Sequence, residues 1–325
     1  MNISEKLFLG GRNHLDLYVN YKCNLKCAHC FVGDNLSSKI EFELESAIKL
    51  LEHSRNSGAK SLSLLGGEPT LYKHIERIIE VANEIEYSEI KLVTNGMKPL
   101  QKIVKVNRFS NKPIIVFSLD SIDKVSFESI RGKGTFKTIL ESITLSLENG
   151  YSCAAIISVS NMNYDTVIET IVMLDKLNFK YINIHHVNEL GFATKTSIVP
   201  IKKWLLLKSN VEDILDDIKI QIRFEEKYKL IDDLDDEKCV LRENLSGNVM
   251  VFPDGRIYRC ALFYDNDEHN SLNWNGSEIV NSNNKTTEVT ICNESSCKGC
   301  PRSSQIIPDE NDYVMTCMYS KTVYN

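Results

Sequence analysis

The chain has no long apolar run and no excess of basic residues, and each absence excludes a class of protein. No run approaches the ~18–20 apolar residues that a membrane-spanning helix needs, so no membrane contact is expected. Lys and Arg number 38 against 44 Asp and Glu, a net charge of −6. The chain therefore has no excess of basic side chains that could neutralise nucleic-acid phosphates. The first twenty residues lack a basic segment followed by an apolar one, so a secretory signal is not expected. These absences predict a cytoplasmic chain that binds no nucleic acid.

What remains is the composition of a globular protein. The 325 residues are 42% hydrophobic and 25% charged, which is enough apolar material for a sizeable core. At about 150 residues a domain, the length favours two domains. The sequence shows no internal repeat and no low-complexity tract beyond a polar stretch at 281–287.

The first two thirds of the chain alternate short apolar runs with helical patterns. Strands are predicted at 15–19, 61–65, 89–94, 114–119, 153–158 and 181–186. Helices are predicted at 41–57, 72–85, 135–148, 164–177 and 201–218. Because βα units join into a parallel sheet by right-handed crossovers, this alternating pattern predicts an α/β fold for residues 1–218, a partial (β/α)6 TIM-like barrel. The chemistry of such folds lies at the C-terminal ends of the strands.

Residues 219–325 predict a second, small, cysteine-rich domain. Its acidic start, within 212–237, is either a solvated linker or a docking surface for a basic peptide. Two short strands, 249–252 and 256–260, flank Asp254-Gly255 and predict a hairpin. The remainder has little apolar periodicity, and such a segment needs a metal to hold its shape.

Cysteine is the unusual feature, with ten residues in the chain. Cys153 stands alone in an apolar run and is predicted to be a buried core residue. The others form two groups, and clustered cysteines in a cytosolic chain favour metal binding or catalysis. The first group is Cys23, Cys27 and Cys30; the second is Cys239, Cys260, Cys292, Cys297, Cys300 and Cys317.

The first group follows the first predicted strand and places three thiolates around one concave point. Thiolates suit zinc or an iron–sulfur cluster. A structural zinc would want a fourth ligand, and His29, adjacent to Cys30, points in an awkward direction for it. Three ligands on a four-iron cluster leave one iron open to a substrate or cofactor. The sequence favours the cluster, with structural zinc as the alternative.

Residues 21–30, YKCNLKCAHC, resemble the signature loop of radical S-adenosylmethionine (SAM) enzymes. Further matches follow in the family's order, and the resemblance covers residues 14–218. The GGEP motif is Gly66, Gly67, Glu68 and Pro69. The other positions are Asn95, after the third strand; Ser118 and Asp120, ending the fourth; Arg131, in an RG-x-G-x-F segment that is typical of peptide-modifying members; and Ser158, with Asn161, ending the fifth.

The resemblance implies a [4Fe–4S] cluster on the three cysteines, SAM as cofactor, and an external flavodoxin- or ferredoxin-type electron donor. It implies that the GGEP motif holds the amino group of SAM: the glycines allow close backbone approach and Glu68 is an anionic acceptor. Asp120 with Ser118 would contact the ribose or carboxylate of SAM, and Arg131 would pair with the carboxylate. His185, His186 and Glu189 end the sixth strand and are expected to face the same pocket.

The second cysteine group resembles the auxiliary-cluster extension of radical SAM enzymes, of the SPASM or shorter twitch type. Fifteen residues separate Cys239 from Gly255, and Cys260 follows after four more. The chain departs from the two-cluster pattern after Cys300, so the resemblance implies one auxiliary [4Fe–4S] cluster on Cys239, Cys260, Cys297 and Cys300. A structural zinc is the alternative. Cys292 and Cys317 could replace a ligand, be inert, or serve as a catalytic thiol that returns a hydrogen atom to a substrate radical, a role also open to Cys153.

The combined features resemble maturases of ribosomally made peptides, which implies a precursor peptide as substrate. The expected outcomes are epimerisation, a thioether, or a C–C or C–O crosslink. Cys23 lies too near the start for a preceding leader-binding domain, so recognition would use a separate leader-binding protein, the acidic stretch or the barrel mouth. The alternatives are an aminocyclitol or sugar-alcohol dehydrogenase, a sulfatase-type maturase that oxidises Ser or Cys, and an iron–sulfur protein that binds SAM without turnover.

Overall fold

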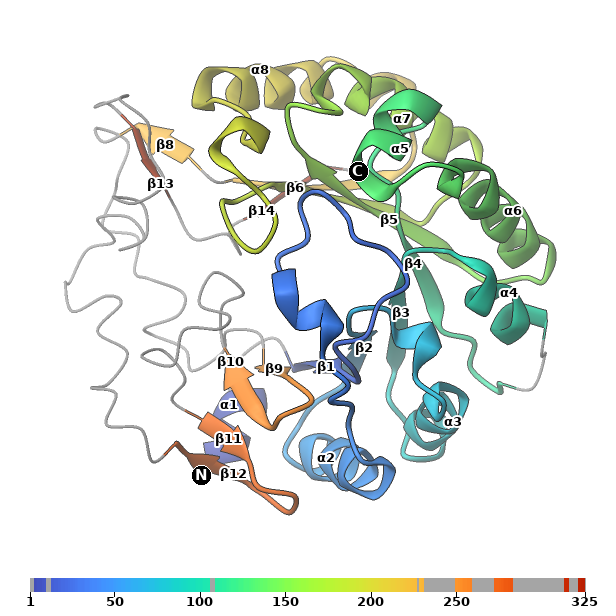
Figure 1. The fold of residues 1–325 in the computed structure, drawn as a ribbon, viewed down its shortest axis with the longest axis vertical. Coiled ribbons are helices and arrows are strands. Elements are labelled where there is room, and N and C mark those ends of the chain that lie inside the picture. Colours follow the sequence, from blue (N-terminus) through green and yellow to red (C-terminus); the bar gives the residue numbers. More distant parts are fainter. Residues whose placement is uncertain are drawn as a thin grey trace.

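The structure is a computed structural model that describes residues 3–9, 13–105, 109–226, 228–230, 249–258, 272–282, 313–315 and 321–324. A curved sheet forms its centre, with helices along the outer side (Figure 1). The α/β fold with a parallel core, predicted from the alternating pattern, is confirmed. Among the described residues, none of the helices combines the length and the apolar character needed to cross a membrane.

Neighbouring strands β1 to β7 pair in parallel, in chain order. They are β1 His14–Tyr18, β2 Ser61–Leu65, β3 Glu89–Thr94, β4 Ile114–Ser118, β5 Cys153–Val159, β6 Tyr181–His186 and β7 Gln221–Glu225. The six predicted strands are all present. β7 is a seventh, which sequence analysis placed inside the acidic stretch.

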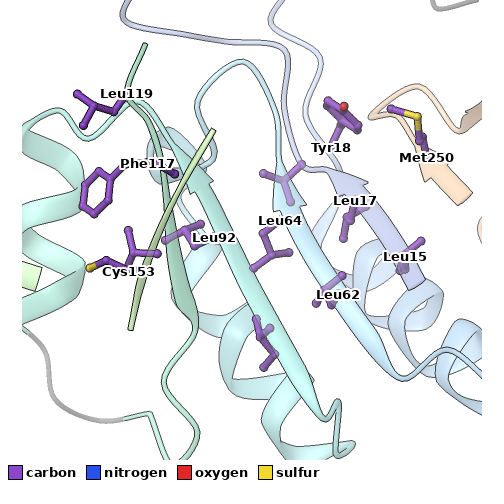
Figure 2. Close-up of a cluster of buried hydrophobic side chains, with 14 of the residues drawn as sticks. Leu15, Leu17, Tyr18, Leu62, Leu64, Leu92, Phe117, Leu119, Cys153 and Met250 are labelled. Atoms are coloured by element: carbon purple, nitrogen blue, oxygen red, sulfur yellow. The ribbon is translucent and has the colours of Figure 1, made fainter. Parts of the chain in front are cut away.

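The helices cover the outer face, on which β-strand leucines such as Leu15, Leu17, Leu62 and Leu64 are fully buried (Figure 2). They are α1 Ile3–Leu9, α2 Leu44–Asn56, α3 Ile75–Glu84, α4 Lys98–Lys105, α5 Lys124–Arg131, α6 Thr135–Glu148, α7 Val167–Lys176 and α8 Ile201–Glu212. Short 3-10 turns are η1 Gly33–Ser37, η2 Pro69–Leu71, η3 Tyr164–Thr166, η4 Lys195–Ser197 and η5 Leu215–Asp217. Sequence analysis missed α1, α4 and α5.

Four predicted helix boundaries were wrong by three residues or more, among them the start predicted at residue 72, where α3 begins at Ile75. The helix predicted from residue 41 begins at Leu44, because the Glu43 side chain accepts the Ser46 N–H and caps the first turn. The helix predicted from 164 opens with the 3-10 turn η3, and the one predicted to 218 ends at Glu212.

Strands beyond residue 218 extend the same sheet at both edges. β9 Val249–Val251 pairs in parallel with β1, and β10 Arg256–Tyr258 turns back antiparallel to β9 around Asp254-Gly255, which confirms the predicted hairpin. β11 Leu272–Trp274 and β12 Ile279–Asn281 follow on that edge, and β14 Lys321–Tyr324 pairs with β7 on the other. A separate pair joins β8 Tyr228–Leu230 to β13 Tyr313–Met315. The division at 218 stays a prediction.

Candidate functional site

A cavity of about 340 Å³ opens at the C-terminal ends of the parallel strands. It gathers residues from six strand ends and from the loop after β1, although they are up to 172 positions apart in the chain, from Tyr18 to Leu190. Its wall includes most of the predicted site residues: Cys23, Cys27, Cys30, Gly66, Gly67, Glu68, Asn95, Ser118, Arg131, Ser158, His185 and His186. Pro69 and Asp120 do not line it, and neither does Glu189.

The three thiols of the first group border this one cavity, and N–H groups point at each of them, with those of Val32 and Gly33 pointing at Cys30. The Leu25 N–H donates to Cys23 Sγ (3.4 Å) and the Asn95 amide donates to the same sulfur (3.7 Å). Arg131 Nη1 donates to Cys27 Sγ (3.7 Å). Burial raises the pKa of Cys23 to about 12 and raises the pKa of the other two thiols. Positive partners are therefore needed to hold thiolates here, and the iron ions of a bound cluster would supply them.

Gly66 and Gly67 bring the GGEP segment against the cysteine loop itself. A Cβ on Gly67 would lie 2.6 Å from the Lys22 carbonyl oxygen, and closer still to that of Tyr21. The main chain is joined there by hydrogen bonds from Gly67 N–H to Asn20 O (2.9 Å) and from Glu68 N–H to Lys22 O (2.8 Å). In this structure the close approach permitted by the glycines is to the chain's own cysteine loop.

The Glu68 carboxylate, predicted to accept the SAM ammonium, is fully buried and bound by its own chain. Oε1 accepts hydrogen bonds from Thr70 N–H (3.1 Å), Thr70 Oγ1 (2.5 Å) and Thr94 Oγ1 (2.7 Å), and Oε2 accepts one from Asn95 N–H (2.8 Å). Desolvation raises the pKa of this carboxyl, and these hydrogen bonds oppose the shift. Glu68 thus joins the ends of β2 and β3.

Arg131 and Asp120 form a buried ion pair at the base of the site, with Arg131 Nε 2.7 Å from Asp120 Oδ2. The second Asp120 oxygen accepts the Ser158 N–H (3.0 Å). The cysteine loop is joined to the residue before Arg131 by a hydrogen bond from the Ala28 N–H to Ile130 O (2.9 Å). The aspartate holds Arg131 from behind the cavity wall, so its effect on any ligand runs through the lining residues that it contacts, Arg131, Ser158 and His29.

Glu225 is the residue of this site that sequence analysis missed. It ends β7 and is 1% exposed, and its Oε2 lies 3.3 Å from Nδ1 of the cavity-lining His185. It fell within the stretch interpreted as acidic linker. The alternation in QIRFE, residues 221–225, was the available signal for a strand.

The segment after β6 closes one side of the cavity by backbone contact. A Cβ on Gly191 (φ +58°) would meet the carbonyl carbon of Phe31 at 2.7 Å, and the Phe192 N–H donates to Cys30 O (3.0 Å). Leu190, from the same segment, lines the cavity.

The β9–β10 hairpin packs against the cysteine loop from the sheet edge. Phe252 stacks on Tyr18, with ring centroids 4.2 Å apart, and Tyr21 Oη donates to Asp254 Oδ2 (2.9 Å). Arg256 pairs with the same aspartate oxygen (2.8 Å). Residues more than 230 positions apart thus brace the loop that carries Cys23.

The second cysteine group lies outside the described residues: Cys239, Cys260, Cys292, Cys297, Cys300 and Cys317. Their predicted roles as ligands or thiol donors stay predictions. Cys153 is 1% exposed on β5 and does not line the cavity, which confirms its interpretation as a core residue and speaks against a hydrogen-donor role (Figure 2).

The described residues contain no group of three His, Cys, Asp or Glu side chains that could hold a single metal ion. The first three cysteines instead share the wall of a cavity, as ligands of different irons in one cluster would. With N–H donors at the sulfurs and a buried guanidinium beside them, these residues fit a thiolate-bound [4Fe–4S] cluster.

Comparison with known proteins gives a match to a protein family. The model of the radical SAM superfamily matches residues 17–174. GTP 3′,8-cyclase of Clostridium perfringens is 27% identical over 184 residues, which are 54% of this chain and 57% of that protein. The antilisterial bacteriocin subtilosin biosynthesis protein AlbA of Bacillus subtilis is 22% identical over 258 residues, 77% of this chain and 55% of that protein. The chain spans about half to three fifths of the length of the curated relatives it matches.

Two solved structures share the fold. Streptococcus suis SuiB bound to precursor peptide SuiA matches with a TM-score of 0.66 at 17% identity, over 82% of this chain and 63% of that one. Native anSMEcpe with bound AdoMet matches with a TM-score of 0.61 at 22% identity, over 80% of this chain and 78% of that one. These likenesses confirm the predicted barrel.

Proposed function

Because this chain is a radical SAM enzyme, we propose that its substrate is a ribosomally made peptide, from which it abstracts a hydrogen atom. The expected products are an epimerised residue, a thioether, or a C–C or C–O crosslink. A [4Fe–4S] cluster on Cys23, Cys27 and Cys30 would supply the electron that cleaves SAM to a 5′-deoxyadenosyl radical.

The chain's own residues prepare this site in three ways. Asn95 and the Leu25 N–H donate to one sulfur and Arg131 donates to another, which favours thiolate ligands. The Gly66–Gly67 backbone, pinned to the cysteine loop, offers main-chain groups at the place proposed for the SAM amino group. Arg131 is the proposed partner of the SAM carboxylate, and Asp120 keeps it aimed at the cavity.

The observation that carries the peptide assignment is the hairpin against the cysteine loop. Its end, Tyr258, precedes Cys260 by two residues in the sequence, and the hairpin itself contacts the loop that carries Cys23. The match to AlbA, a bacteriocin biosynthesis protein, covers 77% of this chain, and SuiB, which shares the fold, binds a precursor peptide. We propose one auxiliary [4Fe–4S] cluster on Cys239, Cys260, Cys297 and Cys300, with Cys292 or Cys317 as a hydrogen donor.

A nucleotide triphosphate, the kind of substrate in the name GTP 3′,8-cyclase, fits the described cavity less well. Among the described residues that line it, Arg131 is the sole permanently positive side chain, and Asp120 already neutralises it. A triphosphate calls for several cationic donors. The match to the cyclase covers 54% of this chain.

The test is anaerobic co-expression with the short peptides encoded beside the gene, in deuterated water, followed by intact-mass measurement. The control is the variant with Cys23, Cys27 and Cys30 replaced by Ala. Deuterium at a non-exchangeable carbon, absent from the control, would indicate epimerisation with a thiol donor. Loss of two hydrogens would indicate a crosslink or a dehydrogenation.

An unchanged mass for every peptide, from a protein that still cleaves SAM, would contradict the peptide assignment. The small-molecule dehydrogenase would then become the better hypothesis.

A further inference from the structure

Asn95, directly after β3, joins the strand ends to the cysteine loop through its side-chain amide. It is 6% exposed and lines the cavity together with Cys23. Its Nδ2 donates to Asn24 Oδ1 (2.8 Å) and to Cys23 Sγ (3.7 Å). Its Oδ1 accepts the Met97 N–H (3.0 Å). Both donors of this amide are therefore used by the chain itself, one of them on a sulfur.

These partners fix which way round the amide lies. The Met97 N–H can only donate, so the Asn95 atom that faces it is the oxygen. Nδ2 then lies on the other side, where each of its two hydrogens has an acceptor. Turning the amide over would bring two donors together at Met97. The contact between an N–H group and the Cys23 sulfur thus follows from the hydrogen bonds around it.

The main chain around Asn95 holds the amide in this place. The Asn95 N–H donates to Glu68 Oε2 (2.8 Å), and the Gly96 N–H donates to Thr94 Oγ1 (3.1 Å). Gly96 has φ +73°, and a Cβ there would lie 2.8 Å from Cγ1 of Ile139. Asn95 therefore presents one N–H to a buried carboxylate and another to a sulfur, from a segment that is packed on both sides.

The three sulfurs of the loop receive donors of different kinds. Main-chain N–H groups point at Cys23 and Cys30. Arg131 is a charged donor at Cys27. Asn95 is a neutral side-chain donor at Cys23. Hydrogen bonds to the sulfurs help to set the reduction potential of an iron–sulfur cluster, because they favour the reduced, more negative state.

We propose that Asn95 is a positioning residue of the cluster: its amide holds Cys23 Sγ in place and makes the [4Fe–4S] cluster easier to reduce. Asn95 acts on SAM through the cluster, since both of its side-chain donors are already engaged within the chain. This inference rests on the cluster of the proposed function and requires nothing of the substrate. A cluster that is easier to reduce accepts its electron from a weaker donor, so Asn95 sets how readily SAM is cleaved.

The experiment compares N95A and N95D with the wild type, and N24A is the matched control. N24A removes the bond between the two amides but leaves the contacts of Asn95 with Cys23 and Met97 in place. Each protein is loaded with iron and sulfide without oxygen, and its cluster is then titrated with redox mediators in the absence of SAM. Electron paramagnetic resonance of the reduced cluster gives the midpoint potential.

N95A should have a more negative midpoint potential, because its reduced cluster lacks one donor. We expect about a tenfold fall in the ratio of reduced to oxidised cluster at a fixed potential, a shift of about 59 mV for one electron. N95D should shift further, since its carboxylate places a negative charge beside the sulfur, and N24A should match the wild type. A side chain that only fills space predicts the reverse order, because Asp and Asn have nearly the same size. That order, or wild-type potentials in both variants, would overturn the proposal.

A second measurement uses the wild type itself and decides the question if N95A and N95D take up no iron. The protein is labelled with 15N in its asparagine side-chain amides, the cluster is reduced, and pulsed electron paramagnetic resonance detects nuclei coupled to it. The hydrogen bond to Cys23 Sγ should give a 15N coupling in the wild type and in N24A. A wild type without this coupling would contradict the role of Asn95.

The loading step separates this inference from the proposed function. A wild type that binds no four-iron cluster, by iron content and visible absorption, would contradict both. A wild type that binds the cluster and shares its midpoint potential with N95A and N95D would contradict only the role of Asn95.

Discussion

Replacing Gly67 with alanine should damage the cysteine loop more than it damages the barrel. The new Cβ would lie 2.6 Å from the Lys22 carbonyl oxygen and closer to that of Tyr21, and both are backbone atoms that cannot rotate away. Overpacking of this kind costs roughly 1–3 kcal/mol, and contact with backbone places G67A near the upper end, at about 3 kcal/mol. If the loop bears that cost, its affinity for the cluster falls about a hundredfold.

The assay reconstitutes the protein with iron and sulfide without oxygen, then titrates a chelator against the visible absorption of the thiolate–iron cluster. G67A should lose its iron at far lower chelator concentration than the wild type. Urea unfolding of both proteins reports the global free energy of unfolding.

The matched control is G150A, at the loop before β5 and so at the opposite end of the strands. Gly150 has φ +71°, and its nearest neighbour, Lys112 Nζ at 3.6 Å, belongs to a flexible side chain. Left-handed strain should cost about 1–2 kcal/mol of stability there and leave iron binding unchanged. A G67A protein that holds iron as tightly as the wild type would refute the reasoning.

Three further predictions follow from the same contacts. D120N should lower the free energy of unfolding in urea by roughly 3–5 kcal/mol, because it leaves the Arg131 charge buried without a carboxylate. The control E80Q, at the surface pair of Arg77 and Glu80, should change that free energy little. Equal effects of the two substitutions would contradict the importance of the buried ion pair. Y21F should lower the free energy of unfolding by about 1 kcal/mol, because it removes the hydrogen bond to Asp254. F252A should lower it by about 3–5 kcal/mol, because it removes the ring that stacks on Tyr18. Unaltered midpoints of urea unfolding would show that the hairpin does not brace the loop. Burial raises the pKa of Cys153 to about 12, so its thiol is protonated at pH 8. Mass spectrometry should therefore find Cys153 unalkylated by iodoacetamide until urea unfolds the chain. Rapid alkylation of the folded protein at Cys153 would contradict its place in the core.

Predictions that depended on local patterns succeeded best. The strands at 61–65, 89–94 and 181–186 have the predicted bounds, since each alternates apolar with polar residues over a short stretch, as strands do. The hairpin at Asp254-Gly255 was predictable for a similar reason, because the turn type depends on adjacent residues. The helices α4 and α5 were missed because each is only eight residues long and presents about two turns of pattern.

The chemical role assigned to a residue was harder to predict than its location. The spacing of the GGEP motif placed Glu68 at the cavity wall. It gave no sign that Thr70, Thr94 and Asn95 would surround the carboxylate, since two of them arrive on another strand. The same holds for Gly67, whose close neighbour is the carbonyl of Tyr21 on the loop after β1.

The sequence alone determined the order of the strands and the end of the barrel at which the site forms, because hydrophobic periodicity and motif spacing are properties of neighbouring residues. It also determined that three cysteines share one loop. The tertiary structure decided which side chains meet across that end: Glu225 with His185, Arg131 with Cys27, and Phe252 with Tyr18. These contacts depend on strand register and on pairing between segments up to 234 residues apart, which no local pattern encodes.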